Sequence, residues 1–220
     1  ARTATEGTMI DIVHPRIERY LRTLIPPRDR VMAAMETRAG RERIPIVGPL
    51  VGRLFFQLAL MVRARRVMEL GSAIGYSTLW WARAVGPKGH VWYTDGAPEN
   101  ARVAAGYFRR AGLGGRVTLM VGDAVTSMRK VKSTFDIVFC DIDKHGYPAA
   151  FEAAWPRIRR GGLFVCDNTL WGGRVTGRAG TADRNTAGIQ RLNRITFADE
   201  ANGFAVLLPL RDGVTVVLKR

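Results

Sequence analysis

Two apolar runs of the sequence are each followed by polar side chains of the kind that bind metal ions. Asp141, Asp143 and Lys144 follow the first run, and Asp167 and Asn168 follow the second. Carboxylate and amide oxygens suit hard divalent cations, and Mg²⁺ commonly shares its octahedral ligand set with substrate. We therefore predict that Asp141, Asp167 and Asn168 bind Mg²⁺ or a similar divalent cation, with coordination positions left open.

A lysine beside such a cation suits acid–base chemistry. The cation can bind both oxygens of a vicinal diol, and it favours the ionised form of a phenolic hydroxyl. Lys144, three residues beyond Asp141, is the predicted general base, with a pKa lowered by burial and by the cation. The alternative for Lys144 is a surface ion pair with Asp143, which contributes little. Asp143 itself either orients Lys144 or contacts a cofactor.

A second group of residues suits a nucleotide cofactor. The segment ELGSAIGYS, residues 69–77, joins the first predicted strand to its helix. Its Gly71 and Gly75 let the backbone approach a ligand near the helix N-terminus. The spacing is G-x-x-x-G and lacks the G-x-G-x-x-G pattern of dinucleotide-binding loops. A glycine pair alone is weak evidence, because a tight turn needs the same residues.

The acidic residues that end the next two strands are stronger evidence. Asp95 can accept hydrogen bonds from both ribose hydroxyls, and Asp123 can accept one from an adenine amino group. Singly, Asp95 can serve a turn and Asp123 can cap a helix. Together they predict an adenosine across the strand ends. S-adenosylmethionine fits this expectation, because the amides of residues 75–77 could bind its carboxylate and Glu69 or the Gly71 carbonyl could bind its amino group. The predicted cofactor contacts are Glu69, Gly71, Gly75, Tyr76, Ser77, Asp95, Gly122, Asp123, Ala124 and Asp141.

These residues require an α/β architecture that brings strand ends together. Runs rich in β-branched and aromatic residues alternate with helical segments, which indicates right-handed βαβ crossovers and a mostly parallel sheet with helices on both faces. The predicted strands are 66–70, 90–95, 116–123, 135–141 and 162–167. The predicted helices between and after them are about 75–86, 97–112, 123–131 and 146–159.

Further elements are predicted on both sides of this alternation. Three helices precede it, at 14–24, 27–39 and 45–62. A helix near 185–198 follows a loop rich in glycine and arginine. The last runs, 204–210 and 213–219, are separated by two residues and are typical of a hairpin, so that the sheet ends in an antiparallel pair.

The chain is predicted to hold one domain over residues 9–220. Residues 9–63 would supply its N-terminal helices and residues 64–220 its core. Residues 1–8 have no apolar periodicity and precede Met9, a plausible native start, so we expect a disordered tail or a cloning remnant there.

Composition limits the class of protein. With 220 residues, 47% of them apolar, the chain can bury one substantial core. No apolar run reaches the roughly 18 residues that span a bilayer. Because the N-terminus also lacks a signal-peptide pattern, we predict a cytoplasmic protein with no membrane partner. Cys140 and Cys166 lie in predicted strands, which favours buried thiols in a reducing compartment.

The charge of the chain is strongly positive. It has 34 basic and 19 acidic residues, a formal net charge of +15. Such a balance suits a polyanionic partner such as nucleic acid. The basic residues are spread along the whole chain, however, which favours a solvated surface, so a nucleic-acid partner is not the favoured interpretation.

From about residue 44 to 220 the sequence resembles the metal-dependent class I O-methyltransferases of the catechol and caffeoyl-coenzyme A type. The matching motifs are ELGSAIGYSTLWWA, VGDA, DIDKHGYP, CDNTLWGGRV and LLPLRDGVTVV. The resemblance implies a Rossmann-like, seven-stranded sheet whose last strand is antiparallel, with S-adenosylmethionine as cofactor. It also implies a homodimer. It assigns the metal to the same three residues, Asp141, Asp167 and Asn168.

These features predict an enzyme that transfers methyl from S-adenosylmethionine, leaving S-adenosylhomocysteine, to a catechol-like aromatic diol, with Lys144 as base. Predicted substrate contacts are Lys144, Asn168, Trp171 and Arg174. Arg174, Arg178 and Arg184 either bind an anionic acceptor or face water. Thr169 stands where relatives commonly have an apolar residue, which leaves the identity of the acceptor open.

Three rival functions remain. A branch of the same family resembles tRNA wobble-hydroxyuridine O-methyltransferases, and a basic patch continuous with the metal cleft would favour that function. A NAD-dependent oxidoreductase is disfavoured by the glycine spacing. A catalytically silent binding module is disfavoured by the intact set of Asp141, Lys144, Asp167 and Asn168.

Overall fold

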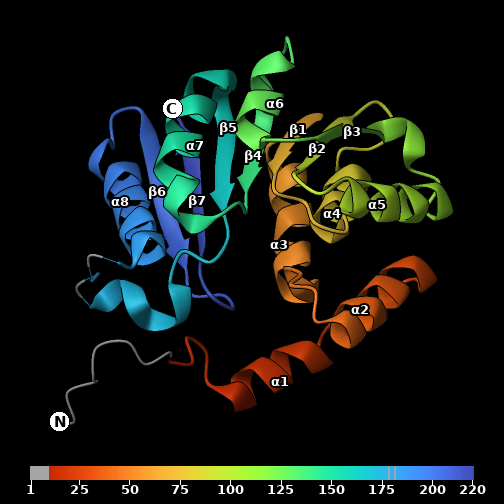
Figure 1. Cartoon of the computed structure of the whole chain (residues 1–220), viewed down its shortest axis with the longest axis horizontal. Helices are drawn as coiled ribbons and strands as arrows, with labels where there is room; N and C mark the ends of the chain where they lie inside the picture. Colours follow the sequence, from red (N-terminus) through yellow and green to blue (C-terminus); the bar gives the residue numbers. More distant parts are fainter. Residues whose placement is uncertain (1–9, 178, 181) are drawn as a thin grey trace.

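A seven-stranded sheet forms the centre of the described part of the molecule (Figure 1). The computed structural model describes residues 10–177, 179–180 and 182–220, so the tail predicted at 1–8 lies outside the described residues. The strand order is β3-β2-β1-β4-β5-β7-β6. The strands are β1 (Arg66–Leu70), β2 (His90–Asp95), β3 (Val117–Val121), β4 (Phe135–Cys140), β5 (Ile158–Cys166), β6 (Gly203–Leu208) and β7 (Val214–Lys219).

The strand directions confirm the predicted topology. Strands β1 to β5 pair in parallel, and β7 runs antiparallel to both of its neighbours, β5 and β6. The central strand β4 is buried along its whole length, as expected for a parallel strand covered on both faces. The carboxyl ends of β1 to β5 therefore meet at one edge of the sheet.

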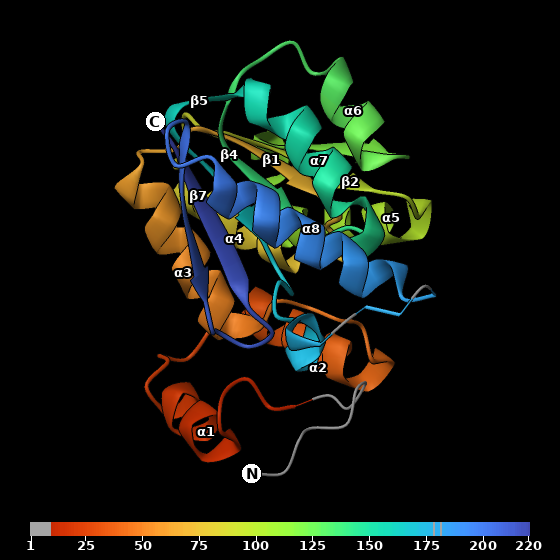
Figure 2. The same cartoon turned by 90° about the vertical axis from the view of Figure 1, so that its left-hand side faces the viewer.

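Helices cover both faces of the sheet (Figure 2). They are α3 (Gly48–Met61), α4 (Tyr76–Ala84) and α5 (Pro98–Arg110) on one face and α6 (Ala124–Lys130), α7 (Tyr147–Ala154) and α8 (Arg184–Ala198) on the other. Alternate residues of one strand face opposite cores: Ile137 and Phe139 of β4 pack with the first group, and Val138 and Cys140 with the second. The predicted two-layer cover is thus confirmed.

The N-terminal helices α1 (Pro15–Thr23) and α2 (Arg30–Glu42) lie at one end of the molecule (Figure 1). Helix α2 buries Met32, Met35 and Ala39 in the core. Helix α1 has no buried residue and exposes Ile17 and Tyr20. The N-terminal segment therefore contributes side chains to the core from α2, from α3 and from Val47 just before α3.

Some predicted bounds differ from the structure. The helix predicted at 146–159 ends at Ala154, because Pro156 lies in a 3₁₀ turn, η3 (Trp155–Arg157), and β5 already begins at Ile158. Further 3₁₀ turns occupy segments predicted as loops or as part of a strand: η1 (Gly114–Arg116), η2 (Lys144–Gly146) and η4 (Trp171–Thr176). Within the described ranges, no helix is long and apolar enough to cross a membrane.

Candidate active site

A cavity of about 620 Å³ lies at the carboxyl ends of the parallel strands. The segments that follow β1 to β5 line it, together with residues 45–47, which precede α3. Predicted site residues on its wall are Gly71, Tyr76, Ser77, Asp95, Gly122, Asp123, Ala124, Asp141, Lys144 and Asn168. Predicted residues that the structure does not bring to the wall are Glu69, Gly75, Asp167, Trp171 and Arg174.

The loop after β1 needs its two glycines for close packing. Both have positive φ, 82° at Gly71 and 84° at Gly75. A Cβ at Gly71 would lie 2.4 Å from the carbonyl oxygen of Asp141, and one at Gly75 would lie 2.6 Å from the ring of Phe108. Helix α4 begins directly after Gly75 with no side-chain cap. The amides of its first turn are therefore available to an anionic group such as a carboxylate.

Glu69 is hydrogen-bonded to the first turn of α4. Its carboxylate is fully buried and accepts short hydrogen bonds from the hydroxyls of Ser77 and Thr78. Burial raises the pKa of Glu69 to about 7, and the hydroxyl donors only partly oppose that rise. The side chain of Glu69 thus joins the end of β1 to the first turn of α4. Its carboxylate does not line the cavity.

Asp95 and Asp123 serve the backbone and also face the cavity. Asp95 accepts hydrogen bonds from the amides of Ala73 (2.9 Å) and Ala97 (2.8 Å). Asp123 caps α6 by accepting from the amide of Thr126 at 2.7 Å. The turn and cap functions are therefore present. Since both residues line the cavity and an ionised carboxylate has about four acceptor sites, each retains capacity for a ligand.

Lys144 forms an ion pair with Asp141. Its Nζ lies 2.7 Å from Asp141 Oδ1 and 3.3 Å from the carbonyl oxygen of Ile142. Burial lowers the pKa of Lys144, but the charge and hydrogen bond of Asp141 outweigh burial and hold that pKa above its ordinary value. The ion pair thus opposes the predicted fall in pKa. The alternative pairing with Asp143 does not occur.

The carboxylate of Asp167 is buried without a full set of hydrogen bonds. It is 1% exposed, and its Oδ1 has no hydrogen-bond partner among the described residues. Its Oδ2 lies 3.9 Å from Arg211 Nη1. Burial and the nearby charge of Asp141 raise the pKa of Asp167 to about 7. A buried acceptor without a donor is costly unless a further partner is present.

The donor set around Asp167 fits a divalent cation. The hydroxyl of Tyr147 donates to the Asp167 carbonyl oxygen (2.9 Å) and lies 3.5 Å from Asp141 Oδ1, which places the two acidic residues beside one another. Asn168 follows in the left-handed region, with φ 56°. Across the described ranges no cluster of three or more His, Cys, Asp or Glu suits a metal. The third ligand predicted from the sequence is an amide, that of Asn168, which lies on the cavity wall.

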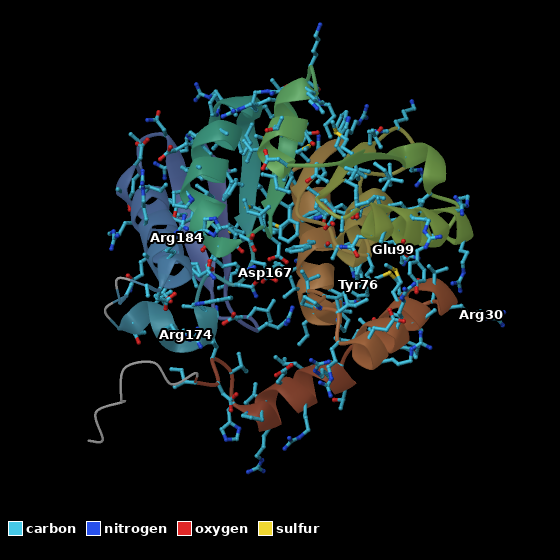
Figure 3. All side chains as sticks on the ribbon, in the orientation of Figure 1. Arg30, Tyr76, Glu99, Asp167, Arg174 and Arg184 are labelled. Atoms are coloured by element: carbon cyan, nitrogen blue, oxygen red, sulfur yellow. The ribbon has the colours of Figure 1, made fainter. Side chains whose placement is uncertain are left out.

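The residues predicted to contact the substrate differ in their distance from Lys144 and the cavity. Lys144 Nζ is 5.8 Å from the centroid of the Trp171 ring. Figure 3 shows Asp167 near the centre of the molecule, with Arg174 and Arg184 together on one side of it. Arg178 lies outside the described residues. Trp171 is therefore near Lys144, the predicted base, whereas Arg174 is absent from the cavity wall.

Several contacts of the site have no local signal in the sequence. Arg211 Nη1 donates to the carbonyl oxygen of Ile46 (2.9 Å), which holds one wall of the cavity across 165 positions of sequence. The hydroxyl of Tyr76 donates to Glu36 Oε1 of α2 (2.7 Å). Tyr147 is buried but also donates its hydroxyl within the site. Such contacts depend on tertiary structure.

Comparisons with known proteins agree with this geometry. Residues 43–220 match the family model described as O-methyltransferase. The chain is 33% identical over 172 residues to the catechol O-methyltransferase of Mycobacterium tuberculosis, covering 77% of this chain and 78% of that protein. It is 32% identical over 171 residues to a probable caffeoyl-CoA O-methyltransferase of Dictyostelium discoideum, with 75% and 74% covered. The structure matches the O-methyltransferase TomG from Streptomyces achromogenes, solved in complex with SAM, with a TM-score of 0.84 and 27% identity over 93% of this chain and 96% of that one.

Proposed function

Because the chain belongs to the O-methyltransferase family, we propose that this S-adenosylmethionine-dependent enzyme methylates one hydroxyl of a vicinal dihydroxy aromatic small molecule. One observation carries the proposal: a buried Asp167 oxygen without a donor lies beside the Asp141–Lys144 ion pair at the edge of a cavity. The catechol specificity of a relative at 33% identity supports the acceptor class.

The chain's own residues have separate tasks in this reaction. S-adenosylmethionine supplies the methyl group, and a divalent cation held by Asp141, Asp167 and Asn168 would supply charge that favours an ionised phenolic hydroxyl and competes with Lys144 for Asp141. The first-turn amides of α4 bind a carboxylate, and Asp95 accepts from ribose hydroxyls. Without the ion pair to Asp141, the pKa of Lys144 falls and its ammonium group loses a proton to water. The neutral Nζ then takes the hydroxyl proton of the acceptor.

The proposal is tested by methyl transfer to a panel of 3,4-dihydroxy aromatics, followed by mass spectrometry with Mg²⁺ and with EDTA. We expect a monomethylated product that requires the metal. Asp141→Ala should abolish this activity while the fold remains. Asp143→Ala is the matched comparison, because Asp143 also lines the cavity but forms no ion pair with Lys144. Equal turnover with EDTA, or unchanged turnover of Asp141→Ala, would contradict the metal-dependent mechanism.

We also propose that the enzyme is a homodimer in which α1 contacts the second copy. The apolar side chains of Ile17 and Tyr20 on α1, of Leu24 directly after α1, and of Leu60 and Met61 on α3 are exposed. A nine-residue helix with no buried side chain is marginal by itself, so a partner that covers this face would stabilise it. A monomer mass by light scattering at micromolar concentration would contradict the dimer.

No observation at the cleft favours tRNA methylation over a small acceptor. That alternative predicts basic residues continuous with the metal site. Hydrogen bonds do join several basic residues into one group. That group, however, lies around the amino ends of β1, β4 and β5, at the opposite edge of the sheet.

A further inference from the structure

The amino-terminal edge of the sheet carries a concentration of positive charge. The segments 62–66, 130–134 and 155–161 lead into β1, β4 and β5, and residues 219–220 end β7 at the same edge. These four segments, called the basic edge below, contain ten basic residues and no acidic residue. The ten are Arg63, Arg65, Arg66, Lys130, Lys132, Arg157, Arg159, Arg160, Lys219 and Arg220.

Hydrogen bonds join the segments of the basic edge into one surface. Arg159 Nη2 donates to the carbonyl oxygen of Val62 at 2.7 Å, and Arg157 Nη2 donates to that of Ser133 at 2.6 Å. Lys219 Nζ donates to two carbonyl oxygens of segment 155–161, at 2.6 and 2.8 Å. Arg157 and Lys219 are thus held in place by neutral carbonyl groups, which do not cancel their charge.

Little negative charge compensates the basic edge. Asp136, buried at the start of β4, pairs with Arg159 at 2.6 Å and lies 4.0 Å from Arg66. Six side chains of the basic edge are exposed and form no ion pair with any described carboxylate: Arg63, Arg65, Lys130, Lys132, Arg160 and Arg220. The cavity edge, by contrast, carries the carboxylates of Asp95, Asp123 and Asp141. The amino-terminal edge therefore carries an excess of cations that no described carboxylate neutralises, whereas cations and carboxylates are paired at the cavity edge.

We propose that the basic edge binds the phosphate backbone of nucleic acid without reading its sequence. Exposed cations that no carboxylate neutralises release counterions when they meet phosphates, and this release drives such binding. None of the large exposed apolar side chains lies in the four segments. Insertion into a lipid surface usually needs such side chains, so nucleic acid fits better than a membrane. Because the cavity lies at the other edge, the nucleic acid is a docking partner and not the methyl acceptor.

The test is fluorescence anisotropy of a short mixed-sequence DNA duplex with the full chain across a salt series. We expect a dissociation constant on the order of 10⁻⁴ to 10⁻⁶ M at physiological salt and a steep salt dependence. The variant Arg65→Glu/Lys132→Glu/Arg160→Glu should weaken binding by about tenfold or more and reduce the salt slope by about three. The side chains of these residues make no hydrogen bond that the fold needs.

A matched variant separates position from net charge. Arg30→Glu/Arg109→Glu/Arg194→Glu makes the same change in charge at exposed sites on α2, α5 and α8. We expect its DNA affinity to fall by less than about threefold, since distant charges are screened beyond roughly 8 Å at physiological salt. Both variants should keep methyl transfer and the wild-type melting temperature, and added DNA should not inhibit methyl transfer by the wild-type enzyme.

Three outcomes would overturn the proposal. Equal losses of affinity in the two variants would mean that overall charge, and not this surface, attracts the duplex. Inhibition of methyl transfer by DNA would place the contact at the cavity. Binding to vesicles that contain phosphatidylserine, with no binding to the duplex at physiological salt, would make the surface a lipid contact.

Discussion

Asp136 and Asp167 are buried carboxylates of neighbouring strands, but they lie at opposite edges of the sheet. Asp136 is 5% exposed and accepts hydrogen bonds from the amides of Arg65 (2.8 Å) and Arg66 (2.7 Å) and from Arg159 Nε (2.6 Å). These donors outweigh burial and hold the pKa of Asp136 below its usual value. Asp167 is 1% exposed, has an oxygen without a donor, and has a pKa raised to about 7.

The difference distinguishes a structural carboxylate from a functional one. Burial costs both residues their hydration, but the chain returns hydrogen bonds only to Asp136. A folded protein keeps an unsatisfied buried acceptor where a ligand completes it. For this pair of residues, donors supplied by the chain stabilise the fold at Asp136, and the missing donor at Asp167 leaves room for a ligand.

Replacing Asp167 by Asn should produce the largest effect, and on activity alone. In the proposed mechanism Asp167 binds the cation directly, and even the residues that support such ligands cost about 10- to 100-fold when they are lost. We therefore expect kcat/KM to fall by at least about a hundredfold. Stability should stay equal or increase, because a buried neutral amide costs less than a buried carboxylate. Urea unfolding and methyl-transfer rates measure both. A large loss of stability would mean that Asp167 is structural, like Asp136.

The second prediction concerns Glu69, a buried carboxylate of the cavity edge whose donors are only hydroxyls. Its folded-state pKa is raised to about 7 from an ordinary value near 4.5. Between those values the folded state binds a proton that the unfolded state has lost, so the contribution of Glu69 to stability falls as pH rises through this window and is constant above it. The full shift corresponds to about 3 kcal/mol as an upper value.

Comparison with Glu69→Gln isolates this effect, because glutamine has no proton to exchange. The free energy of unfolding, measured with urea at intervals from pH 4.5 to 7.5, should decline in the wild type relative to the variant. Parallel curves for the two proteins would show that the hydroxyls of Ser77 and Thr78 keep Glu69 ionised, as the donors of Asp136 do.

The sequence predicted the edge that carries the site better than it predicted the state of each side chain. Strands β1 and β2 have the predicted bounds, because β-branched and aromatic residues bounded by polar ones are a local signal. Local spacing also placed Asp141 and Lys144 within one short segment. No local signal shows that the carboxylate of Asp136 is satisfied, because its donors come from residues 65, 66 and 159.

Asp136→Asn should produce a smaller effect than the preceding changes, and on stability alone. The variant keeps one acceptor oxygen, so its NH2 group must face either Arg159 or the backbone amides of residues 65 and 66, all of which also donate. Hydrogen bonds to charged groups contribute about 1.5 to 3 kcal/mol, so we expect a loss of about 2 kcal/mol in urea unfolding. The kcat/KM of the folded fraction should be unchanged. Reduced kcat/KM with full stability would show that a change at the amino-terminal edge alters the structure of the cavity.

The smallest effects should separate the two arginines that share Asp136. Arg159 Nε lies 2.6 Å from the carboxylate, with a side chain 35% exposed, whereas Arg66 Nε lies 4.0 Å away on a side chain 42% exposed. Arg159→Gln should cost about 1 kcal/mol, and Arg66→Gln less than about 0.5 kcal/mol, because a long, exposed ion pair is screened by water. Equal costs would mean that the total charge around Asp136, and not the hydrogen bond from Arg159, stabilises it. In that case the difference in pKa between Asp136 and Asp167 would depend on the number of nearby cations, and added salt should reduce that difference.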